Sequence, residues 1–260
     1  MVNPEKVSAK IVKWLEAKVR GAGARGAVVG LSGGIDSAVV AALAARAFPG
    51  GVLGLIMPCH SNPEDMRDAA EIAGVLGIPT RTVDLSPAYE ALLSILAGGR
   101  GEPWGAGGSV ECGPTDLAAA NIKPRLRMIT LYYFASKLNY LVLGTGNRSE
   151  LTIGYFTKHG DGGVDLLPIG SLVKTQVREL ATFLGIPERI RTKPPTAGLW
   201  EGQTDEGEMG MSYEDLDSYI LNGQASDEVA ARVQELARRS EHKRSLPAIP
   251  SPDELGLDSD

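Results

Sequence analysis

The sequence has few cysteines and no long apolar run. Only two cysteines occur in its 260 residues, Cys59 and Cys112, and neither belongs to a CxxC pair. A disulfide framework or a structural zinc site therefore has no support. No apolar stretch reaches the roughly 18 to 20 residues that span a bilayer, and the start MVNPEKVSAK lacks the apolar core of a signal peptide. We therefore expect a cytoplasmic protein that does not enter a membrane.

Positive charge is also in short supply. The 26 Lys and Arg are outnumbered by 32 Asp and Glu, which gives a formal net charge of −6. Proteins that bind nucleic acid normally draw on clustered Lys and Arg, so we expect no nucleic-acid partner. With 43% hydrophobic and 22% charged residues, the composition is that of one large α/β domain covering residues 1–260.

Strands and helices alternate along the first 144 residues. Short buried apolar runs predict strands, and apolar residues at helical spacing predict helices between them. We expect strands at Ala27–Leu31, Gly51–Met57, Thr80–Leu85 and Tyr140–Gly144. We expect helices at Pro4–Arg20, Ile35–Phe48, Asn62–Leu76, Ser86–Leu96 and, after the Gly-rich stretch Gly98–Gly113, a long helix through Lys137 that tolerates Pro124 as a break or kink.

This order predicts an open doubly wound α/β fold, with a parallel sheet flanked by helices. Ligands bind such Rossmann-like sheets beyond the carboxyl ends of the strands. Strand signals fade after Asn147, where we expect only helices, at Lys174–Leu184, Tyr213–Leu221 and Asp227–Arg239. The segment Pro194–Met211 has prolines, glycines and acidic residues without periodicity, so we interpret it as a mobile lid.

The strongest motif is GLSGGIDS, Gly30–Ser37, between a predicted strand and a predicted helix. Gly33 and Gly34 allow a tight turn whose N–H groups point outward, and the following helix adds a partial positive charge for phosphate oxygens. Ser32 and Ser37 can donate hydroxyl hydrogen bonds, and Asp36 can hold Mg²⁺. The loop has no lysine and is therefore not a Walker A motif. It resembles the SGGxDS signature of PP-loop ATP pyrophosphatases.

Two other glycine patterns carry less weight. GAGARG, Gly21–Gly26, fits GxGxxG but precedes the first strand, so the geometry of a dinucleotide-binding turn is missing and we interpret it as a loop. GTGNRSE, Gly144–Glu150, follows a strand but has Ser149 where the third Gly or Ala is needed. Spacing alone therefore gives no dinucleotide site.

The motifs downstream point to one family. Taken in order, they resemble ammonia-dependent NAD synthetases of bacteria and archaea, over about Ile11 to Pro247, whose fold is of the adenine nucleotide alpha hydrolase type. They are NIKPRLRM (Asn121–Met128), GTGNRSE (Gly144–Glu150), GYFTKHGDGGVDLLPI (Gly154–Ile169), LVKTQVREL (Leu172–Leu180), PPTAGLW (Pro194–Trp200) and EHKR (Glu241–Arg244).

The resemblance implies an activity and an ATP site. Such an enzyme adenylates the carboxylate of deamido-NAD with ATP, then amidates it with ammonia, releasing AMP and pyrophosphate. Mg²⁺ would be held by Asp36 and Glu150. The ATP contacts implied are Gly30, Leu31, Ser32, Gly33, Gly34, Ile35, Asp36, Ser37, Thr145, Lys174 and Thr196.

The resemblance also implies a site for deamido-NAD, to which the C-terminal segment, about residues 240–260, contributes. Its residues would be Arg125, Lys158, Asp165, His242 and Lys243. We expect Asp36, Lys174 and Asp165 to act in catalysis, with Asp165 orienting ammonia or taking its proton. Taken singly, these side chains are more often solvated surface charges or turn residues.

Some positions and alternatives stay open. GTGNRSE and PPTAGLW depart from forms found in some relatives, which leaves the roles of Asn147, Arg148 and Gly198 undecided. The alternatives are another PP-loop amidotransferase or tRNA-modifying enzyme and a non-catalytic adenine-nucleotide sensor. Thiolation of tRNA would predict a cysteine pair and a basic surface, which the sequence lacks.

The family resemblance also implies a homodimer. The apolar residues Met128, Ile129, Leu131, Tyr132, Tyr133 and Phe134 give the helix after Asn121 more hydrophobic surface than one sheet face needs. We therefore expect deamido-NAD to bind near a twofold interface. A separate glutaminase stays open as the source of ammonia.

Overall fold

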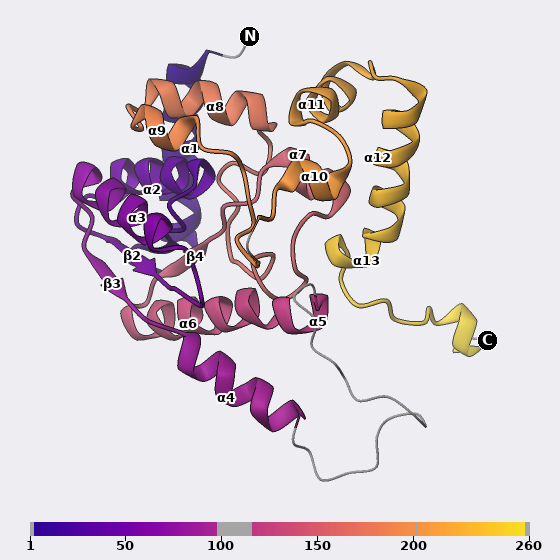
Figure 1. Ribbon diagram of the computed structural model, residues 1–260, viewed down its shortest axis with the longest axis horizontal. Coiled ribbons are helices and arrows are strands. Elements are labelled where there is room, and N and C mark those ends of the chain that lie inside the picture. The colour runs from indigo at the N-terminus through magenta and orange to yellow at the C-terminus, as the bar shows by residue number, and fades with distance from the viewer. Residues whose placement is uncertain (1–2, 98–115, 201, 258–260) are drawn as a thin grey trace.

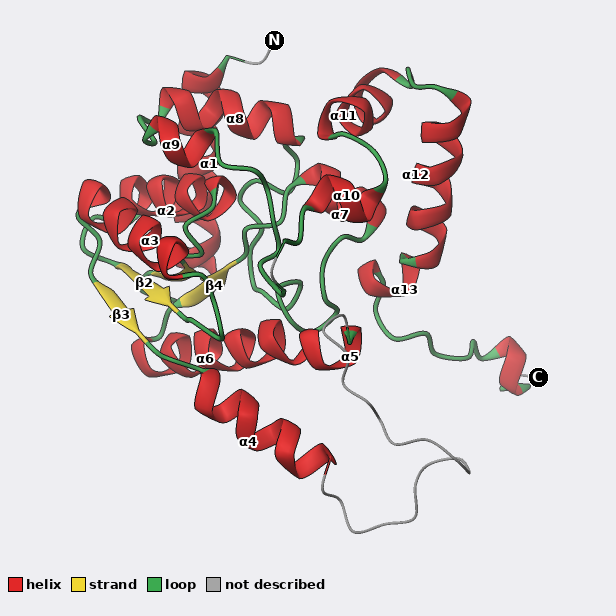
Figure 2. Cartoon of the chain, viewed as in Figure 1, coloured by secondary structure: helices red, strands yellow, loops and turns green. Residues whose placement is uncertain are grey.

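The computed structural model describes residues 3–97, 116–200 and 202–257. Its centre is a four-stranded parallel sheet in the order β3-β2-β1-β4 (Figure 2). The strands are β1 (Ala27–Gly30), β2 (Val52–Ile56), β3 (Thr80–Thr82) and β4 (Leu141–Leu143). All four predicted strands are therefore present with trimmed ends, and the predicted doubly wound parallel sheet is confirmed.

Strand β1 is the axis of the sheet. Val28 pairs with Leu53 of β2 on one side and with Val142 of β4 on the other. Val28 and Val29 are fully buried, as expected for a parallel sheet covered on both faces. From β1 the chain adds β2 and β3 on one side of the sheet and then returns to add β4 on the other side of β1. The loop after β1 therefore lies at the point where ligands bind such sheets.

Helices cover both faces of the sheet (Figure 1). Helix α6 (Ile122–Leu138) packs on one face against β1 and β4, with α4 (Ser86–Ala97) and α5 (Leu117–Ala120) beside it. Helix α2 lies between sheet and helices on the other face, which explains its uniformly apolar sequence. This second layer consists of α1 (Pro4–Gly21), α2 (Ile35–Ala47), α3 (Pro63–Leu76), α8 (Lys174–Phe183) and α9 (Glu188–Arg191).

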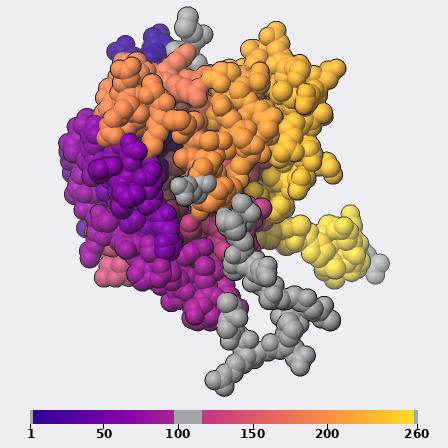
Figure 3. Space-filling model, in the orientation of Figure 1, coloured from indigo at the N-terminus to yellow at the C-terminus, as the bar shows by residue number. Residues whose placement is uncertain are grey.

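The C-terminal third adds a small helical unit with its own apolar cluster, built around Ile153, Met209, Tyr213, Leu216 and Val233. In Figure 3 the light orange and yellow atoms of this unit lie on the right, beside the N-terminal part of the chain. Its elements are α7 (Arg148–Ile153), α10 (Asp205–Met209), α11 (Tyr213–Asn222), α12 (Asp227–Arg239), α13 (Glu241–Arg244) and the 3-10 turn η1 (Asp253–Leu255). Within the described ranges, the structure has no helix with the length and apolarity needed to cross a bilayer.

One prediction about the chain needs correction, and another falls outside the described residues. The long helix before Lys137 is interrupted at Asn121 and not at Pro124. Pro124 is the third residue of α6, where a missing backbone N–H removes no hydrogen bond. The predicted Gly-rich stretch Gly98–Gly113 and Cys112 lie outside the described residues.

The segment Pro194–Met211 is not irregular throughout, as the sequence suggested. Its second half forms α10, whose N-cap Thr204 accepts a hydrogen bond from the N–H of Gly207 at 3.3 Å. Gly210 ends the helix in a left-handed conformation, and Met209 is 1% exposed. The sequence did not predict α10, because so short a helix does not show apolar periodicity.

Candidate active site

The loop from Gly30 to Ser37 joins β1 to α2 in a tight turn. Gly33 has a φ of +79°, and a Cβ there would lie 2.4 Å from the carbonyl oxygen of Asp65. Only glycine fits this position, for both conformational and steric reasons. The predicted ATP residues Gly30, Leu31, Gly34 and Ile35 complete the turn, which leads into the N-terminus of α2.

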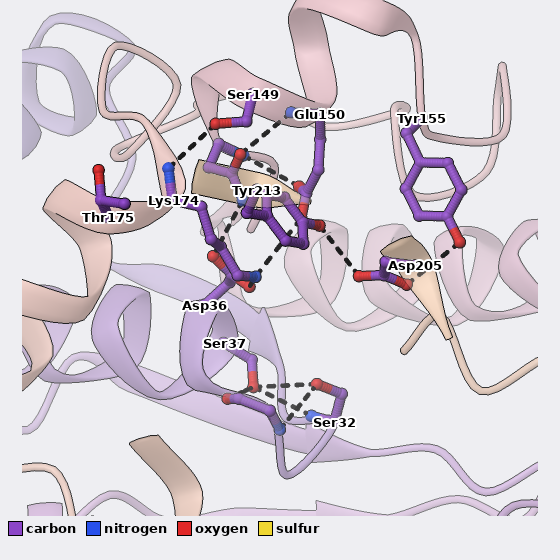
Figure 4. Close-up of polar contacts among 12 residues, drawn as sticks. Ser32, Asp36, Ser37, Ser149, Glu150, Tyr155, Lys174, Thr175, Asp205 and Tyr213 are labelled. Atoms are coloured by element: carbon purple, nitrogen blue, oxygen red, sulfur yellow. Dashed lines mark hydrogen bonds and ion pairs between the residues drawn. The ribbon is translucent and has the colours of Figure 1, made fainter. Parts of the chain in front are cut away.

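Two serines brace the loop from within. The Ser37 hydroxyl donates to the carbonyl oxygen of Gly34 at 2.9 Å and accepts from the N–H of Ser32 at 3.3 Å. The Oγ atoms of Ser32 and Ser37 are 3.1 Å apart (Figure 4). Both hydroxyls bond to atoms of the loop itself and therefore stabilise the turn. The N-terminus of α2, with its partial positive charge, follows directly.

Three predicted residues meet next to this loop. The Lys174 Nζ atom is 2.5 Å from Asp36 Oδ2 and 3.8 Å from Glu150 Oε1 (Figure 4). They occupy the first turns of α2, α7 and α8, so three helix N-termini converge here. Positive helix ends and a lysine suit the oxygens of a polyphosphate.

The electrostatics of this cluster are unusual for surface charges. Burial, followed by the negative charge of Asp36, raises the pKa of Glu150 to about 8. Burial alone would lower the pKa of Lys174, but the charges of Asp36 and Glu150 outweigh it and raise that pKa. The lysine therefore stays protonated and holds two carboxylates that would otherwise repel each other.

The backbone around Glu150 is fixed by a capping box. The Asn147 side chain accepts from the N–H of Glu150 at 3.1 Å, and Glu150 Oε2 accepts from the N–H of Asn147 at 3.1 Å. Asn147 Nδ2 also donates to Asp36 Oδ1 at 3.1 Å. Asn147, whose role the sequence left undecided, thus connects both proposed metal ligands.

Asp217 of α11 fixes the positions of α7 and α8, the helices that carry Glu150 and Lys174. It is 2% exposed and accepts from the Ser149 hydroxyl at 2.5 Å and from the N–H of Thr175 at 2.7 Å. Ser149 in turn accepts from the N–H of Lys174 at 3.0 Å. This buried carboxylate therefore sets the relative position of α7 and α8 and favours the positive end of α8.

Four of the five residues predicted to hold deamido-NAD, all but Asp165, make contacts in a separate region. Arg125 donates to the carbonyl oxygen of Lys158 at 3.4 Å, and Lys158 donates to the carbonyl oxygen of His242 at 2.5 Å. Lys243 donates to the carbonyl oxygens of Gly154 and Phe156, both at 2.8 Å. The short helix α13 is thereby held against the chain that follows α7.

Asp165 lies apart from the lysine-centred cluster. Its carboxylate accepts from the N–H of Val142 at 2.7 Å and from the Tyr132 hydroxyl at 3.1 Å. Burial and the nearby Asp165 charge raise the pKa of Tyr132 to about 12, so this phenol remains a donor. Asp165 is thus fixed between β4 and α6, not beside Lys174. Of the other predicted ATP contacts, Thr196 accepts from the N–H of Gly198 at 3.1 Å, and Thr145 follows β4.

Sequence reasoning missed several polar residues around the cluster. Tyr213, fully buried, reaches both Glu150 and Asp205, and Tyr155 reaches Asp205 (Figure 4). The Asn147 to Glu150 spacing is a capping-box pattern that could have marked α7. Nothing local in the sequence marks Tyr213 or Asp205, because their contacts span 50 residues or more to Tyr155 and Glu150.

The carboxylates of Asp36 and Glu150 fit a magnesium ion. Both already converge on one cation, the Lys174 ammonium, and their side chains are 18% and 16% exposed. Mg²⁺ in nucleotide sites is commonly bound by one or two carboxylates together with phosphate oxygens. The pair provides that donor set next to a phosphate-binding loop.

Comparisons with known proteins agree with this geometry. Residues 7–247 match the family model described as NAD synthase. The NH(3)-dependent NAD(+) synthetase of Carboxydothermus hydrogenoformans is 56% identical over 249 residues, covering 96% of this chain and 98% of that protein.

Solved structures extend the match to the fold. An NMN synthetase from Francisella tularensis is 40% identical with a TM-score of 0.87, covering 96% of this chain and 99% of that one. An NH3-dependent NAD synthetase from Campylobacter jejuni, 28% identical, covers 96% of this chain and 100% of that one with a TM-score of 0.75. The chain therefore belongs to the NAD synthase family.

Proposed function

We propose that the protein makes NAD by amidating deamido-NAD with ammonia at the expense of ATP, releasing AMP and pyrophosphate. The observation that carries the proposal is the meeting of Asp36, Glu150 and Lys174 beside the phosphate loop. A nucleotide sensor needs the loop but has no need for two partly exposed carboxylates around a buried lysine. The names of the relatives supply the nature of the second substrate.

The first chemical step joins the two substrates. A carboxylate oxygen of deamido-NAD attacks the α-phosphorus of ATP, the bond to the bridging oxygen breaks, and pyrophosphate leaves. The loop N–H groups and Lys174 stabilise the negative charge that develops on the phosphates. Mg²⁺ held by Asp36 and Glu150 would supply further charge neutralisation when bound.

The second step releases the product. Ammonia attacks the acyl carbon of the adenylate, loses a proton, and AMP leaves with the former carboxylate oxygen. Arg125, Lys158, His242 and Lys243 hold deamido-NAD in the proposal, and Asp165 orients ammonia or takes its proton. That role for Asp165 requires the acyl carbon to bind near the end of β4, where Asp165 accepts from Val142.

One assay tests the proposed reaction. Purified protein is given ATP, Mg²⁺, deamido-NAD and either ammonium or glutamine, and NAD, AMP and pyrophosphate are measured. We expect equal amounts of the three products with ammonium and little with glutamine. Formation of AMP without deamido-NAD would favour another ATP pyrophosphatase, and absence of any turnover would favour a sensor. Equal rates with glutamine would contradict ammonia dependence.

A smaller acceptor is a second candidate substrate. The solved structure with 40% identity is that of an NMN synthetase, and amidation of nicotinate mononucleotide would yield NMN. The same assay with nicotinate mononucleotide in place of deamido-NAD separates the two. We expect a higher kcat/KM for deamido-NAD, in line with the name of the 56% identical relative.

We further propose that the enzyme works as a twofold dimer in the cytoplasm, where ATP is available. Helix α6 exposes Ile129 and Tyr133, which are 59% and 54% exposed, and α4 exposes Ile95 and Leu96. A neighbouring groove of about 440 Å³ is lined by both α6 residues and by Val83. Exposed apolar side chains of this kind are typical of a protein interface. Light scattering at micromolar concentration should give twice 27.4 kDa, and a monomer mass would contradict the dimer.

A further inference from the structure

Tyr213 connects the proposed metal ligand Glu150 to a third carboxylate, Asp205. It is the first residue of α11 and fully buried, with the Lys174 Nζ atom 4.9 Å from its ring centroid. Its hydroxyl oxygen lies 3.3 Å from Glu150 Oε1 and 3.0 Å from Asp205 Oδ2 (Figure 4). Two carboxylates therefore compete for one phenol.

A phenol has a single proton and can donate it to only one acceptor at a time. Burial and the surrounding carboxylates, first among them Glu150, raise the pKa of Tyr213, so the proton stays on the phenol. Asp205 also contacts the Tyr155 hydroxyl at 3.1 Å, a phenol that it shares with Glu208. The direction of the Tyr213 hydroxyl thus depends on which of the two carboxylates carries the stronger negative charge.

Asp205 also holds the segment that contains Thr196. Its backbone N–H donates to the carbonyl oxygen of Pro195 at 3.2 Å. Two further hydrogen bonds hold the other end of this segment at Leu199. The Leu199 N–H donates to the Gln203 side chain at 2.7 Å, and Lys123 donates to the Leu199 carbonyl oxygen at 2.7 Å. One residue, Asp205, thus bonds to the Pro195–Leu199 segment through its backbone and to Tyr213 through its side chain.

We propose that Tyr213 and Asp205 are positioning residues that couple cation binding at Glu150 to the ordering of the Pro195–Leu199 segment. A divalent cation that binds Glu150 weakens this carboxylate as a hydrogen-bond acceptor. The Tyr213 proton then turns to Asp205, which fixes Asp205 and, through its N–H, Pro195. Linkage is reciprocal, so an ordered segment also strengthens cation binding. This inference rests on the proposed metal ligands of the ATP site.

The substitution Tyr213→Phe tests the coupling, since it removes the hydroxyl and keeps the ring beneath Lys174. The matched control is Tyr219→Phe on the same helix, whose hydroxyl accepts from Gln234 at 3.3 Å. Binding of Mn²⁺ is measured by spin resonance with a non-hydrolysable ATP analogue. Because the wild type loses the bond to Glu150 and gains one to Asp205 when the cation binds, we expect Tyr213→Phe to change this affinity by less than about 5-fold. We expect Tyr219→Phe to leave it unchanged, and the ordering of the Pro195–Leu199 segment decides the coupling.

Hydrogen exchange gives a second readout that a purely structural role would not move. In the wild type and in Tyr219→Phe, the amides of Thr196, Ala197 and Leu199 should exchange more slowly once Mg²⁺ joins the ATP analogue. In Tyr213→Phe, Mg²⁺ should add no protection. Asp205→Asn, which retains the backbone N–H and the shape of the side chain, should reduce the added protection and provides a second variant if Tyr213→Phe fails to fold.

The outcomes separate this inference from the proposed function. If Tyr213→Phe shows the same Mg²⁺-dependent protection as the wild type, the coupling is wrong even when the wild type makes NAD. If the wild type makes no NAD, the proposed function is wrong, but the exchange comparison still decides the coupling. Equal losses in Tyr213→Phe and Tyr219→Phe would also overturn it, because the effect would then come from α11 as a whole.

Discussion

Two charged clusters flank the phosphate loop, and they differ in how their charges are matched. In the first, between α3 and α9, Asp65, Asp68 and Glu71 all contact Arg189 or Lys193. In the second, the active-site cluster, Lys174 contacts Asp36 and Glu150, and the two further carboxylates, Asp205 and Glu208, bond to phenols. The first cluster is nearly balanced, and the second carries excess negative charge.

The difference shows in the pKa values. Burial alone would raise the pKa of Asp68, but Lys193 and Arg189 outweigh it and hold that pKa below its ordinary value of 3.8. Burial and the nearby Asp36 charge raise the pKa of Glu150 to about 8, and burial also raises that of Asp205. Matched charges favour the folded state, whereas unmatched carboxylates favour an added proton or cation. The comparison separates a cluster that supports the loop from one that serves the reaction.

Among the charge removals that test this comparison, the one in the active-site cluster should have the largest effect, and the effect should be on kcat. Asp36→Asn keeps the size of the side chain and the Gly33 turn but removes a negative ligand. We expect ATP to bind and kcat to fall by about 10²- to 10³-fold, the cost of losing a transition-state charge contact. ATP affinity is measured by calorimetry and kcat by NAD formation. If kcat stays near the wild-type value in Mg²⁺, Asp36 is not a metal ligand.

Removal of a charge outside both clusters should affect substrate binding more than chemistry. Arg125→Ala should raise the KM for deamido-NAD by about 10-fold or more, with a smaller change in kcat, because its contact is shared by ground and transition states. Steady-state kinetics with varied deamido-NAD measures the split. The control Arg178→Ala removes a partly exposed arginine that pairs with Glu214 and should leave KM unchanged. A loss confined to kcat would place Arg125 in the chemical step.

Removal of a charge from the α3–α9 cluster should lower stability by a smaller free energy. Asp68→Asn loses the ion pairs with Arg189 and Lys193, and we expect about 1 to 2 kcal/mol less free energy of unfolding at neutral pH. Because the pKa of Asp68 is lowered in the folded state, its ionised carboxylate stabilises the fold at pH values above 3.8. This stabilisation is lost as the pH falls through the lowered pKa. The difference between variant and wild type should therefore shrink below pH 3.8. Urea titrations at several pH values measure this, and a constant difference would contradict it. Glu235→Gln, in an exposed pair, should cost less.

The predictable part of the molecule is the part with local signals. The strand at Ala27–Gly30 and the helix at Ile35–Ala47 follow from apolar runs and from the Gly-Gly turn between them. Asn62 and Pro63 mark the start of α3, and Asn62 indeed caps it. These features depend on residues only a few positions apart, so pattern and turn chemistry are enough to place them.

The other part depends on contacts across long sequence separations. Asp36 and Lys174 are 138 positions apart, and only the fold shows that they meet. Family resemblance placed them in one site, but not the capping of α8 by Asp217 or the bridge from Tyr213 to Asp205. The helix α10 was missed because Met209 is buried in an apolar cluster that also draws on Ile153 and Val233, and the helix itself is too short to show periodicity.

Transfer of a labelled oxygen tests the central claim, the adenylate intermediate, most directly. Deamido-NAD carrying ¹⁸O at both carboxylate oxygens is incubated with the enzyme, ATP, Mg²⁺ and ammonium, and AMP and pyrophosphate are analysed by mass spectrometry. Since the carboxylate oxygen attacks the α-phosphorus and leaves with AMP, each AMP formed should carry one ¹⁸O and pyrophosphate none. Label in inorganic phosphate, with ADP as the other product, would show attack at the γ-phosphorus and contradict the account.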